Sequence, residues 1–267
     1  MNALKLLACA ALAVALCAQA FADEGEDNGN DKPAYKFRGG HINVSVSIDE
    51  TLKKYDGLYD NLLAEGKRDA AKWNTQAEQD AKKYKDLYRD GHRDDYERGY
   101  SERSLILDRY VSVIRGDYVD GHGAHPNHST DTILWDAQEK KRISIRPFFK
   151  ETADGGPTMA ALAKAIRAAL AAEKKSRDIE VKDPDTDEAL SAVKPSLTNI
   201  GGVALAPSSE AGKSSGLICY FSPYAVGAYV EGDYTVFIPW TAFKDTLSAE
   251  GAALFSGERP QSDADKD

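Results

Sequence analysis

Cysteine is scarce in this chain, and most of the chain has almost none. Of three cysteines among 267 residues, Cys9 and Cys17 fall within the first 22 residues, which leaves Cys219 alone in the remainder. A single thiol cannot form a disulfide within its own chain. Cys219 lies in the apolar run 216–221, where a free cysteine is typically a small buried side chain, since a reactive thiol needs an electropositive setting. We therefore expect Cys219 to be buried and structural.

Basic side chains and nucleotide-binding motifs are also in short supply. The chain has 34 lysines and arginines against 43 acidic residues, and this net charge of −9 argues against nucleic acid or an anionic membrane surface as the main partner. The sequence contains no phosphate-binding loop, no Gly-x-Gly-x-x-Gly and no paired-cysteine motif. No serine has the context of a nucleophile elbow. These absences favour a protein that is not an enzyme and needs no cofactor.

The first 22 residues contain the long apolar run of the sequence. Leu6–Ala18 follows Lys5, and the small residues of Ala20-Phe21-Ala22 precede an acidic stretch. This pattern predicts a signal peptide over residues 1–22, because a spanning helix needs about 20 apolar residues and this run is shorter. A retained anchor and a lipid attached at Cys9 are the alternatives. We expect residues 23–34 to be a disordered acidic tether and the protein to be periplasmic or secreted.

Hydrophobic spacing predicts the helices and strands of the remaining chain. Apolar residues at helical spacing predict a helix over 52–63, ended by Gly66, and a second over 73–88, while Pro157 opens a third. Strands are predicted at 42–48, 104–118, 130–135, 142–145, 196–205, 217–221 and 234–238. The predicted fold class is α+β, a mixed, mostly antiparallel sheet with helices packed against it.

Domain boundaries follow from the same pattern. We expect residues 35–182 and 183–256 to be two subregions of one shared sheet, since no internal repeat or second linker separates them. The polar residues 257–267 are predicted to be a disordered tail.

Several short segments resemble the extracellular module of RsiV anti-sigma factors and PdaC peptidoglycan deacetylases. They are Gly121-His-Gly-Ala-His-Pro-Asn127, Leu134-Trp-Asp136, Pro147-Phe-Phe-Lys150, Gly216–Tyr224, Gly227–Gly232 and Val236–Trp240. The sequence departs from the family pattern at Ser222, Ala225 and Trp240 and by an inserted His122. The resemblance implies a PdaC-like subregion over 35–182 and an RsiV-like subregion over 183–256. We expect neither the sigma-binding segment nor the deacetylase domain in this chain.

Histidines concentrate in the first of these segments. His122, His125 and His128, with Asp120 and Asp131, are the densest group of candidate metal ligands, and two imidazoles three residues apart could share a Zn²⁺. The glycine, proline and asparagine of the segment equally suit a tight turn with hydrogen-bonding histidines. We expect the turn and no metal, and keep a metal-dependent envelope hydrolase centred on the three histidines as an alternative function.

The segment Ser222–Gly232 connects two predicted strands and contains two tyrosines. Tyrosine offers a large amphipathic contact area at a small entropic cost, which suits a recognition loop, although these rings could also pack back onto the sheet. The predicted binding residues are His122, His125, Asn127, Ser222, Pro223, Tyr224, Tyr229 and Glu231.

The resemblance implies a partner. RsiV modules recognise lysozyme, so the expected function is a cell-envelope binding module for a lysozyme-like muramidase or for peptidoglycan. Since Lys5 is the one charged side chain of the first 22 residues, the rest of the chain has 33 basic and 43 acidic residues, which suits a basic partner. A structural subunit of an envelope complex, docking through the amphipathic helix Lys67–Arg89, is a further alternative.

Overall fold

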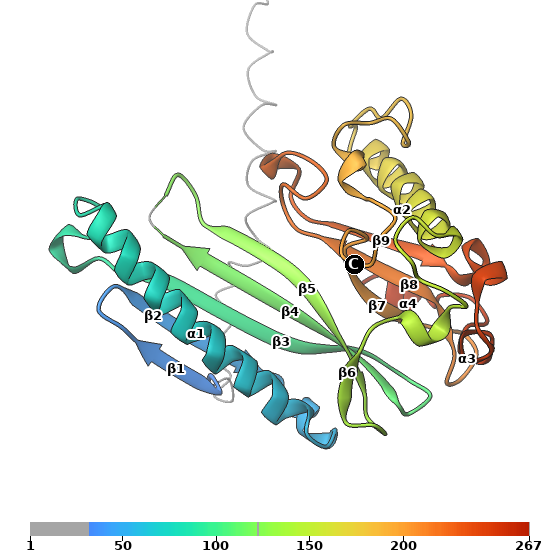
Figure 1. Cartoon of the computed structure of the whole chain (residues 1–267), viewed down its shortest axis with the longest axis horizontal. Helices are drawn as coiled ribbons and strands as arrows, with labels where there is room; N and C mark the ends of the chain where they lie inside the picture. The colour runs from blue at the N-terminus through green and yellow to red at the C-terminus, as the bar shows by residue number, and fades with distance from the viewer. Residues whose placement is uncertain (1–31, 122, 267) are drawn as a thin grey trace, which may run out of the picture. The chain divides into compact units, whose positions relative to one another are not determined.

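The N-terminal half is a six-stranded sheet with one long helix on it. In the computed structural model, which describes residues 32–121 and 123–266, strands β1 to β6 lie in chain order (Figure 1). They are β1 Tyr35–Arg38, β2 Ile42–Ile48, β3 Asp94–Ile106, β4 Tyr110–Asp120, β5 Asn127–Asp136 and β6 Lys141–Ile143. Neighbours are antiparallel except β2 and β3, which are parallel and are connected through helix α1, Leu58–Lys83. The predicted signal peptide and residues 23–31 of the predicted tether lie outside the described residues.

The C-terminal half is a three-stranded antiparallel sheet with a helix packed along its last strand. Its elements are α2 Pro157–Ser176, β7 Gly202–Pro207, β8 Ser214–Phe221, β9 Tyr234–Pro239, α3 Ala249–Leu254 and α4 Gln261–Ala264. Pro157 begins α2 as predicted, because its fixed φ and missing N–H suit the first helical position. With mostly antiparallel sheets and helices against them, the predicted α+β class is confirmed.

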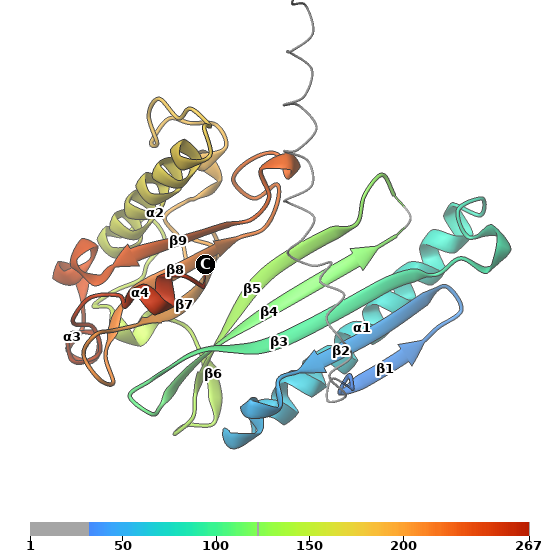
Figure 2. The ribbon, with the colours of Figure 1, turned by 180° about the vertical axis from the view of Figure 1, so that it is seen from behind.

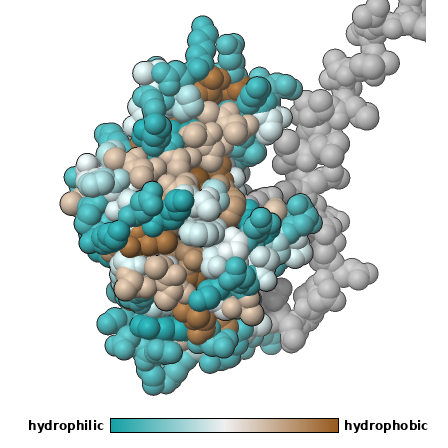
Figure 3. All heavy atoms as spheres, turned by 90° about the vertical axis from the view of Figure 1, so that its right-hand side faces the viewer, coloured by the Kyte–Doolittle hydropathy of each residue, from teal (hydrophilic) through white to brown (hydrophobic). Residues whose placement is uncertain are grey.

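Figure 3 shows the side of the molecule that carries α2 and α3. Small hydrophobic areas there are separated by hydrophilic residues, the mixture expected of a solvated face. Across residues 32–121 and 123–266, no helix combines the length and apolar character that a membrane crossing requires.

The two halves do not share one sheet, and that prediction was wrong. Side-chain hydroxyls, rather than a backbone ladder, connect β7 to the six-stranded sheet. Ser104 Oγ donates to Leu205 O (2.6 Å), Leu205 N donates to Ser112 Oγ (3.0 Å), and Thr132 Oγ1 donates to Val203 O (2.9 Å). Three neighbouring strands therefore satisfy the outer backbone groups of β7, and sequence spacing gives no sign of such a junction.

Helix α1 is continuous where the sequence predicted two helices. Gly66 lies inside it against β2, and an added Cβ would come 2.8 Å from Val46 Cγ1, so this glycine allows close packing instead of ending the helix. Trp73 stacks on Tyr96 of β3, and Ala77 is buried against the sheet. The apolar side of α1 from Lys67 to Lys83 is thus covered by the chain's own sheet, whereas Tyr84 and Leu87 beyond its end are exposed. The part of this segment that could dock on an envelope complex is therefore smaller than the sequence suggested.

Residues 104–118 form a hairpin instead of the single predicted strand. Leu107–Arg109 connect β3 to β4, and Arg109 N donates to Ile106 O at 3.1 Å. The two central residues of this turn, Leu107 and Asp108, have φ of 57° and 50°, the left-handed conformation that a type I′ turn demands. Asparagine and glycine usually fill such turns, so this leucine and aspartate gave no turn signal. The start of β3 was missed as well, because its charged residues resemble a loop. The predicted hairpin around 137–141 is confirmed as β5 and β6.

Two hydrophobic cores support these halves. One lies between α1 and the six-stranded sheet, and the larger one lies between α2 and the three-stranded sheet. Cys219 belongs to the larger core and is fully buried, and this burial raises the pKa of its thiol to about 12. The predicted structural role of Cys219 is therefore confirmed.

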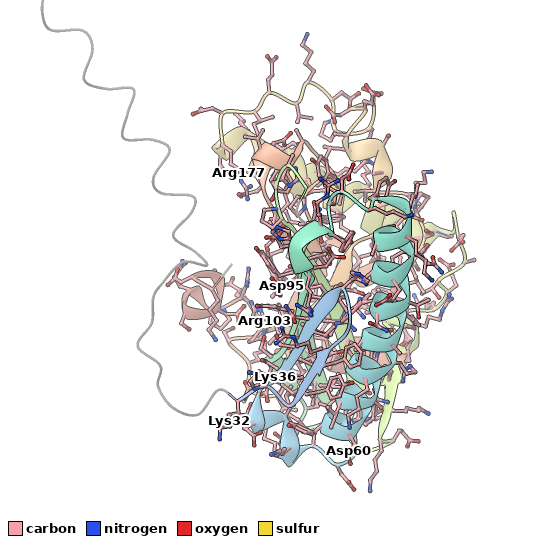
Figure 4. All side chains as sticks on the ribbon, turned by 90° about the vertical axis from the view of Figure 1, so that its left-hand side faces the viewer. Lys32, Lys36, Asp60, Asp95, Arg103 and Arg177 are labelled. Atoms are coloured by element: carbon pink, nitrogen blue, oxygen red, sulfur yellow. The ribbon has the colours of Figure 1, made fainter. Side chains whose placement is uncertain are left out.

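The C-terminal tail is ordered as far as it is described, contrary to the predicted disorder. Asp263 on α4 is 3% exposed and accepts Arg103 Nη1 at 2.5 Å and Arg259 Nε at 2.7 Å. Arg103 lies on β3, on the side of the sheet away from α1 (Figure 4). A contact between residues 160 positions apart could not be predicted from local spacing.

Replacing Asp263 with alanine is expected to lower the free energy of unfolding by about 1–3 kcal/mol, because two guanidinium groups lose their carboxylate. The loss stays below that of a central ion pair, since the tail can detach and expose both arginines. Urea unfolding measures the change. Asp265→Ala, at an exposed position of the same tail, is the matched control, and equal stabilities for the two variants would contradict the role of Asp263.

Candidate functional site

Two connections far apart in the sequence meet at one end of the molecule. The described residues of the β4–β5 turn, 121 and 123–126, and the β8–β9 loop, residues 222–233, both lie at the upper end in Figures 1 and 2. The ring of His125 stacks on that of Tyr229 with centroids 3.9 Å apart and an interplanar angle of 23°. Tyr229 Oη donates to Pro126 O at 2.8 Å. The turn and the loop, which the sequence placed in one binding surface, are therefore in direct contact.

The second tyrosine of the loop is exposed and conformationally unusual. Tyr224 is 63% exposed, its hydroxyl lies 3.3 Å from His125 Nε2, and its φ of 69° is in the left-handed region that favours glycine. A non-glycine residue there costs free energy and is a frequent mark of a functional loop. Val230, at the end of the same loop, is 91% exposed. The aromatic cluster thus presents a ring and an apolar side chain to solvent.

The C-terminal end of α2 holds the β8–β9 loop in place. The buried Lys174 forms an ion pair with Glu231, whose carboxylate also accepts Tyr234 Oη at 2.6 Å and Ala228 N at 2.8 Å. Arg177, labelled in Figure 4, donates to the backbone carbonyl of Glu231 at 2.9 Å. The carboxylate of Glu231 is therefore directed into the molecule and holds the loop, and its predicted binding role stays a prediction.

Two acidic groups at the base of the loop have opposite pKa shifts. Burial alone would raise the pKa of Glu231, but the hydrogen bonds from Lys174 and Tyr234 outweigh it and bring the pKa to about 2. Burial raises the pKa of Asp233, and His128, 3.2 Å away, offsets only part of that rise. The loop therefore holds one strongly ionised carboxylate and one that is protonated more readily than usual.

Acid is expected to destabilise the anchored loop. The pKa of Glu231 is about 2 in the folded protein and 4.5 without these contacts, so its stabilisation is present above pH 4.5 and is lost as the pH falls from there towards 2. The stability difference between the wild-type protein and Glu231→Gln should shrink over that range. Urea unfolding at pH 6 and pH 3 measures it, and a difference independent of pH would contradict the assigned anchor.

The remaining predicted residues have different positions. Ser222 Oγ accepts Thr130 N at 2.9 Å and so ties the start of the loop to β5. Asn127 is exposed at the beginning of β5, and Pro223 is half-buried. His122 lies outside the described residues. Within residues 32–121 and 123–266, no group of three histidine, cysteine, aspartate or glutamate side chains could hold a metal ion.

Sequence reasoning missed one aromatic residue of the site. Tyr118 on β4 lies opposite His128 on β5 and is 39% exposed. Its pKa is raised, by burial first and then by the nearby Asp120 and other acidic groups. Tyr118 ends the predicted strand 104–118. Its alternation with Gly116 and Ile114 could have placed it on the face of the sheet that also carries His128.

Comparison with known proteins connects this chain to one family and one fold. A crystal structure from a DUF3298 family protein of Pseudomonas aeruginosa PAO1 matches with a TM-score of 0.51 and 16% identity, over 84% of this chain and 94% of that one. A member of the DUF3298 family from Bacteroides fragilis NCTC 9343 matches with a TM-score of 0.49 and 15% identity, over 82% and 96% of the two chains. The first likeness supports the fold alone.

No curated protein matches the sequence. Among family models, the one described as "Protein of unknown function (DUF3298)" matches residues 148–241, which include α2, the three-stranded sheet and the whole β8–β9 loop. Residues 148–241 are therefore similar to the DUF3298 domain, whose function is unknown.

Proposed function

We propose that this protein is an exported, non-enzymatic binding module of the cell envelope that recognises a lysozyme-like muramidase. The observation that carries the proposal is the aromatic cluster of His125, Tyr224 and Tyr229, formed by two distant connections and held from below by the Lys174–Glu231 pair. A preorganised loop loses little conformational entropy when a partner binds. The exposed Tyr224 and the partly buried Tyr229 that supports it are of the residue type that commonly dominates binding energy.

Charge and sequence resemblance support the choice of partner. The chain carries a net charge of −9, and a muramidase of the lysozyme type is basic, so opposite charges would speed their encounter. The segments that resemble RsiV include both the β4–β5 turn and the β8–β9 loop. Peptidoglycan, the other ligand implied by that resemblance, lacks the net positive charge that would complement this chain.

Truncating the tyrosines is expected to weaken binding of hen lysozyme. Tyr224→Ala and Tyr229→Ala should each lower the affinity by roughly tenfold or more, the effect of removing a central aromatic contact. Isothermal titration calorimetry at low salt measures the dissociation constants. Tyr84→Ala, at a 45% exposed tyrosine beyond the end of α1, is the matched control and should leave the affinity unchanged.

Two results would count against this function. One is an absence of lysozyme binding by the wild-type protein at low salt. The other is co-sedimentation with purified peptidoglycan that Tyr224→Ala reduces, which would transfer the same surface to the glycan polymer.

A further inference from the structure

A hollow lies beside the root of the β8–β9 loop, outside the aromatic cluster. It has a volume of about 520 Å³, is open to solvent, and is bordered by β5, the segment 197–202 and the end of β8. Small-molecule sites commonly have volumes of roughly 300–1,000 Å³ and lie where two substructures meet. This one lies where the six-stranded sheet meets the three-stranded sheet, and no step of the proposed muramidase recognition uses it.

The lining of the hollow combines an apolar wall with neutral hydrogen-bonding groups and one carboxylate, that of Asp131. Leu197, Phe221 and Val226 supply the wall, while Asn199 and Ser222 supply an amide and a hydroxyl. None of the residues that line the hollow is a lysine, an arginine or a histidine. An anionic ligand would therefore find no counter-charge, which disfavours phosphates, nucleotides and carboxylates.

Two polar side chains at the rim have fixed orientations and can still form further hydrogen bonds. Asn199 Oδ1 accepts Ser196 Oγ at 2.7 Å and Thr198 Oγ1 at 3.1 Å, which leaves its Nδ2 with no partner among the described residues. The carboxylate of Asp131 is held by Arg115 at 2.7 Å and is still half-exposed. The rim thus offers one directed donor and one directed acceptor.

The wall that carries these groups cannot easily move. Gly201 has φ of 83°, and a Cβ added there would come 2.7 Å from Tyr220 O, so the segment runs in close contact with β8. Thr130 N bonds to Ser222 Oγ on the opposite side. A preformed hollow of this kind pays little to order itself around a ligand.

We infer that this hollow binds a neutral saccharide carrying an acetamido group. The carbonyl of such a group can accept from Asn199 Nδ2, its methyl can pack on the partly exposed Leu197, and sugar hydroxyls can donate to Asp131. A plain hexose offers the hydroxyls but lacks the methyl and the amide. The inference is independent of muramidase recognition, because it uses neither Tyr224 nor Tyr229.

Titration of ¹⁵N-labelled protein with tri-N-acetylchitotriose tests the inference. Chemical-shift changes are expected at residues 197–202 and 222–226, with a dissociation constant between roughly 0.1 and 10 mM, since the groove is small and open. Cellotriose, which has no acetamido group, should bind at least fivefold more weakly. Absence of shift changes up to roughly 20 mM, or equal affinity for the two sugars, would overturn the inference.

Two variants make the location specific. Ala225→Trp places a large ring at the exposed rim of the hollow, and Asn199→Asp removes its free donor while keeping the acceptor. Each variant should lower the affinity for tri-N-acetylchitotriose by roughly fivefold or more. Ala252→Trp, at an exposed alanine of α3, is the matched control. Tyr224→Ala should leave chitotriose affinity unchanged, so failure of muramidase binding and failure of saccharide binding are separate outcomes.

Discussion

Replacing Arg98 with methionine is expected to lower the free energy of unfolding by about 3–5 kcal/mol, the usual cost of removing one partner from a buried ion pair. Arg98 is 4% exposed and lies between α1 and the sheet, where it bonds to Asp117 at 2.5 Å and to Asp69 at 2.6 Å. Its guanidinium also lies 4.7 Å from the ring of Trp73. Methionine fills much of the volume but removes the buried cation from both carboxylates, which leaves Asp69 with Lys72 at 2.9 Å and Asp117 with Arg115 at 4.0 Å.

Urea unfolding at pH 7 measures this loss, and a lower melting temperature accompanies it. Arg89→Met is the matched control, since Arg89 pairs with Asp86 at an exposed position, and such pairs contribute roughly 0–1 kcal/mol. If the two variants were equally stable, the polar contacts beneath α1 would not hold that helix to the sheet.

Replacing Lys174 with methionine is expected to cost about 3 kcal/mol of stability and to weaken partner binding as well. Lys174 is 2% exposed, pairs with Glu231, and lies 4.9 Å from the ring of Tyr234. Methionine keeps the helix propensity and the length of the side chain. The carboxylate of Glu231 then loses its cation, and the loop loses the contact that fixes it to α2.

The double variant Lys174→Met with Glu231→Gln separates charge from packing. Because no uncompensated charge is left, it should recover most of the stability that Lys174→Met loses. Lysozyme affinity, measured by calorimetry on all three variants, should follow the order of their stabilities if the anchor preorganises the loop. A double variant as unstable as Lys174→Met would show that the pair contributes packing and no charge balance.

The sequence predicted those helices and strands whose apolar residues recur at regular helical or strand spacing. Helix α2 was predicted from Pro157 and the apolar spacing behind it, and β2 from the alternation over 42–48. The hairpin turn at Leu107 and Asp108 was missed because these residues occupy left-handed positions that asparagine and glycine usually fill. Gly66 was misinterpreted because a glycine that permits close packing and one that ends a helix look alike in a sequence.

The candidate site was predicted in part for the same reason. His125, Tyr224 and Tyr229 stood out by composition, and their family-like segments placed them in one surface. Their stacking could not be predicted, since it joins residues about a hundred positions apart. Glu231 was listed with the binding residues because it lies in the same loop as the tyrosines, and its ion pair with Lys174, 57 residues earlier, could not be predicted from local spacing.

The two outermost strands of the six-stranded sheet are also its shortest. β1 has four residues and β6 has three, whereas β3 between them has 13. A strand of another chain can hydrogen-bond to the unpaired backbone groups of an edge strand. Short edge strands that carry charges, such as Lys36 and Arg38 of β1, offer few such groups and disfavour this pairing. Lengthening β1 with uncharged residues would therefore allow edge-to-edge pairing between the sheets of different molecules, and so aggregation.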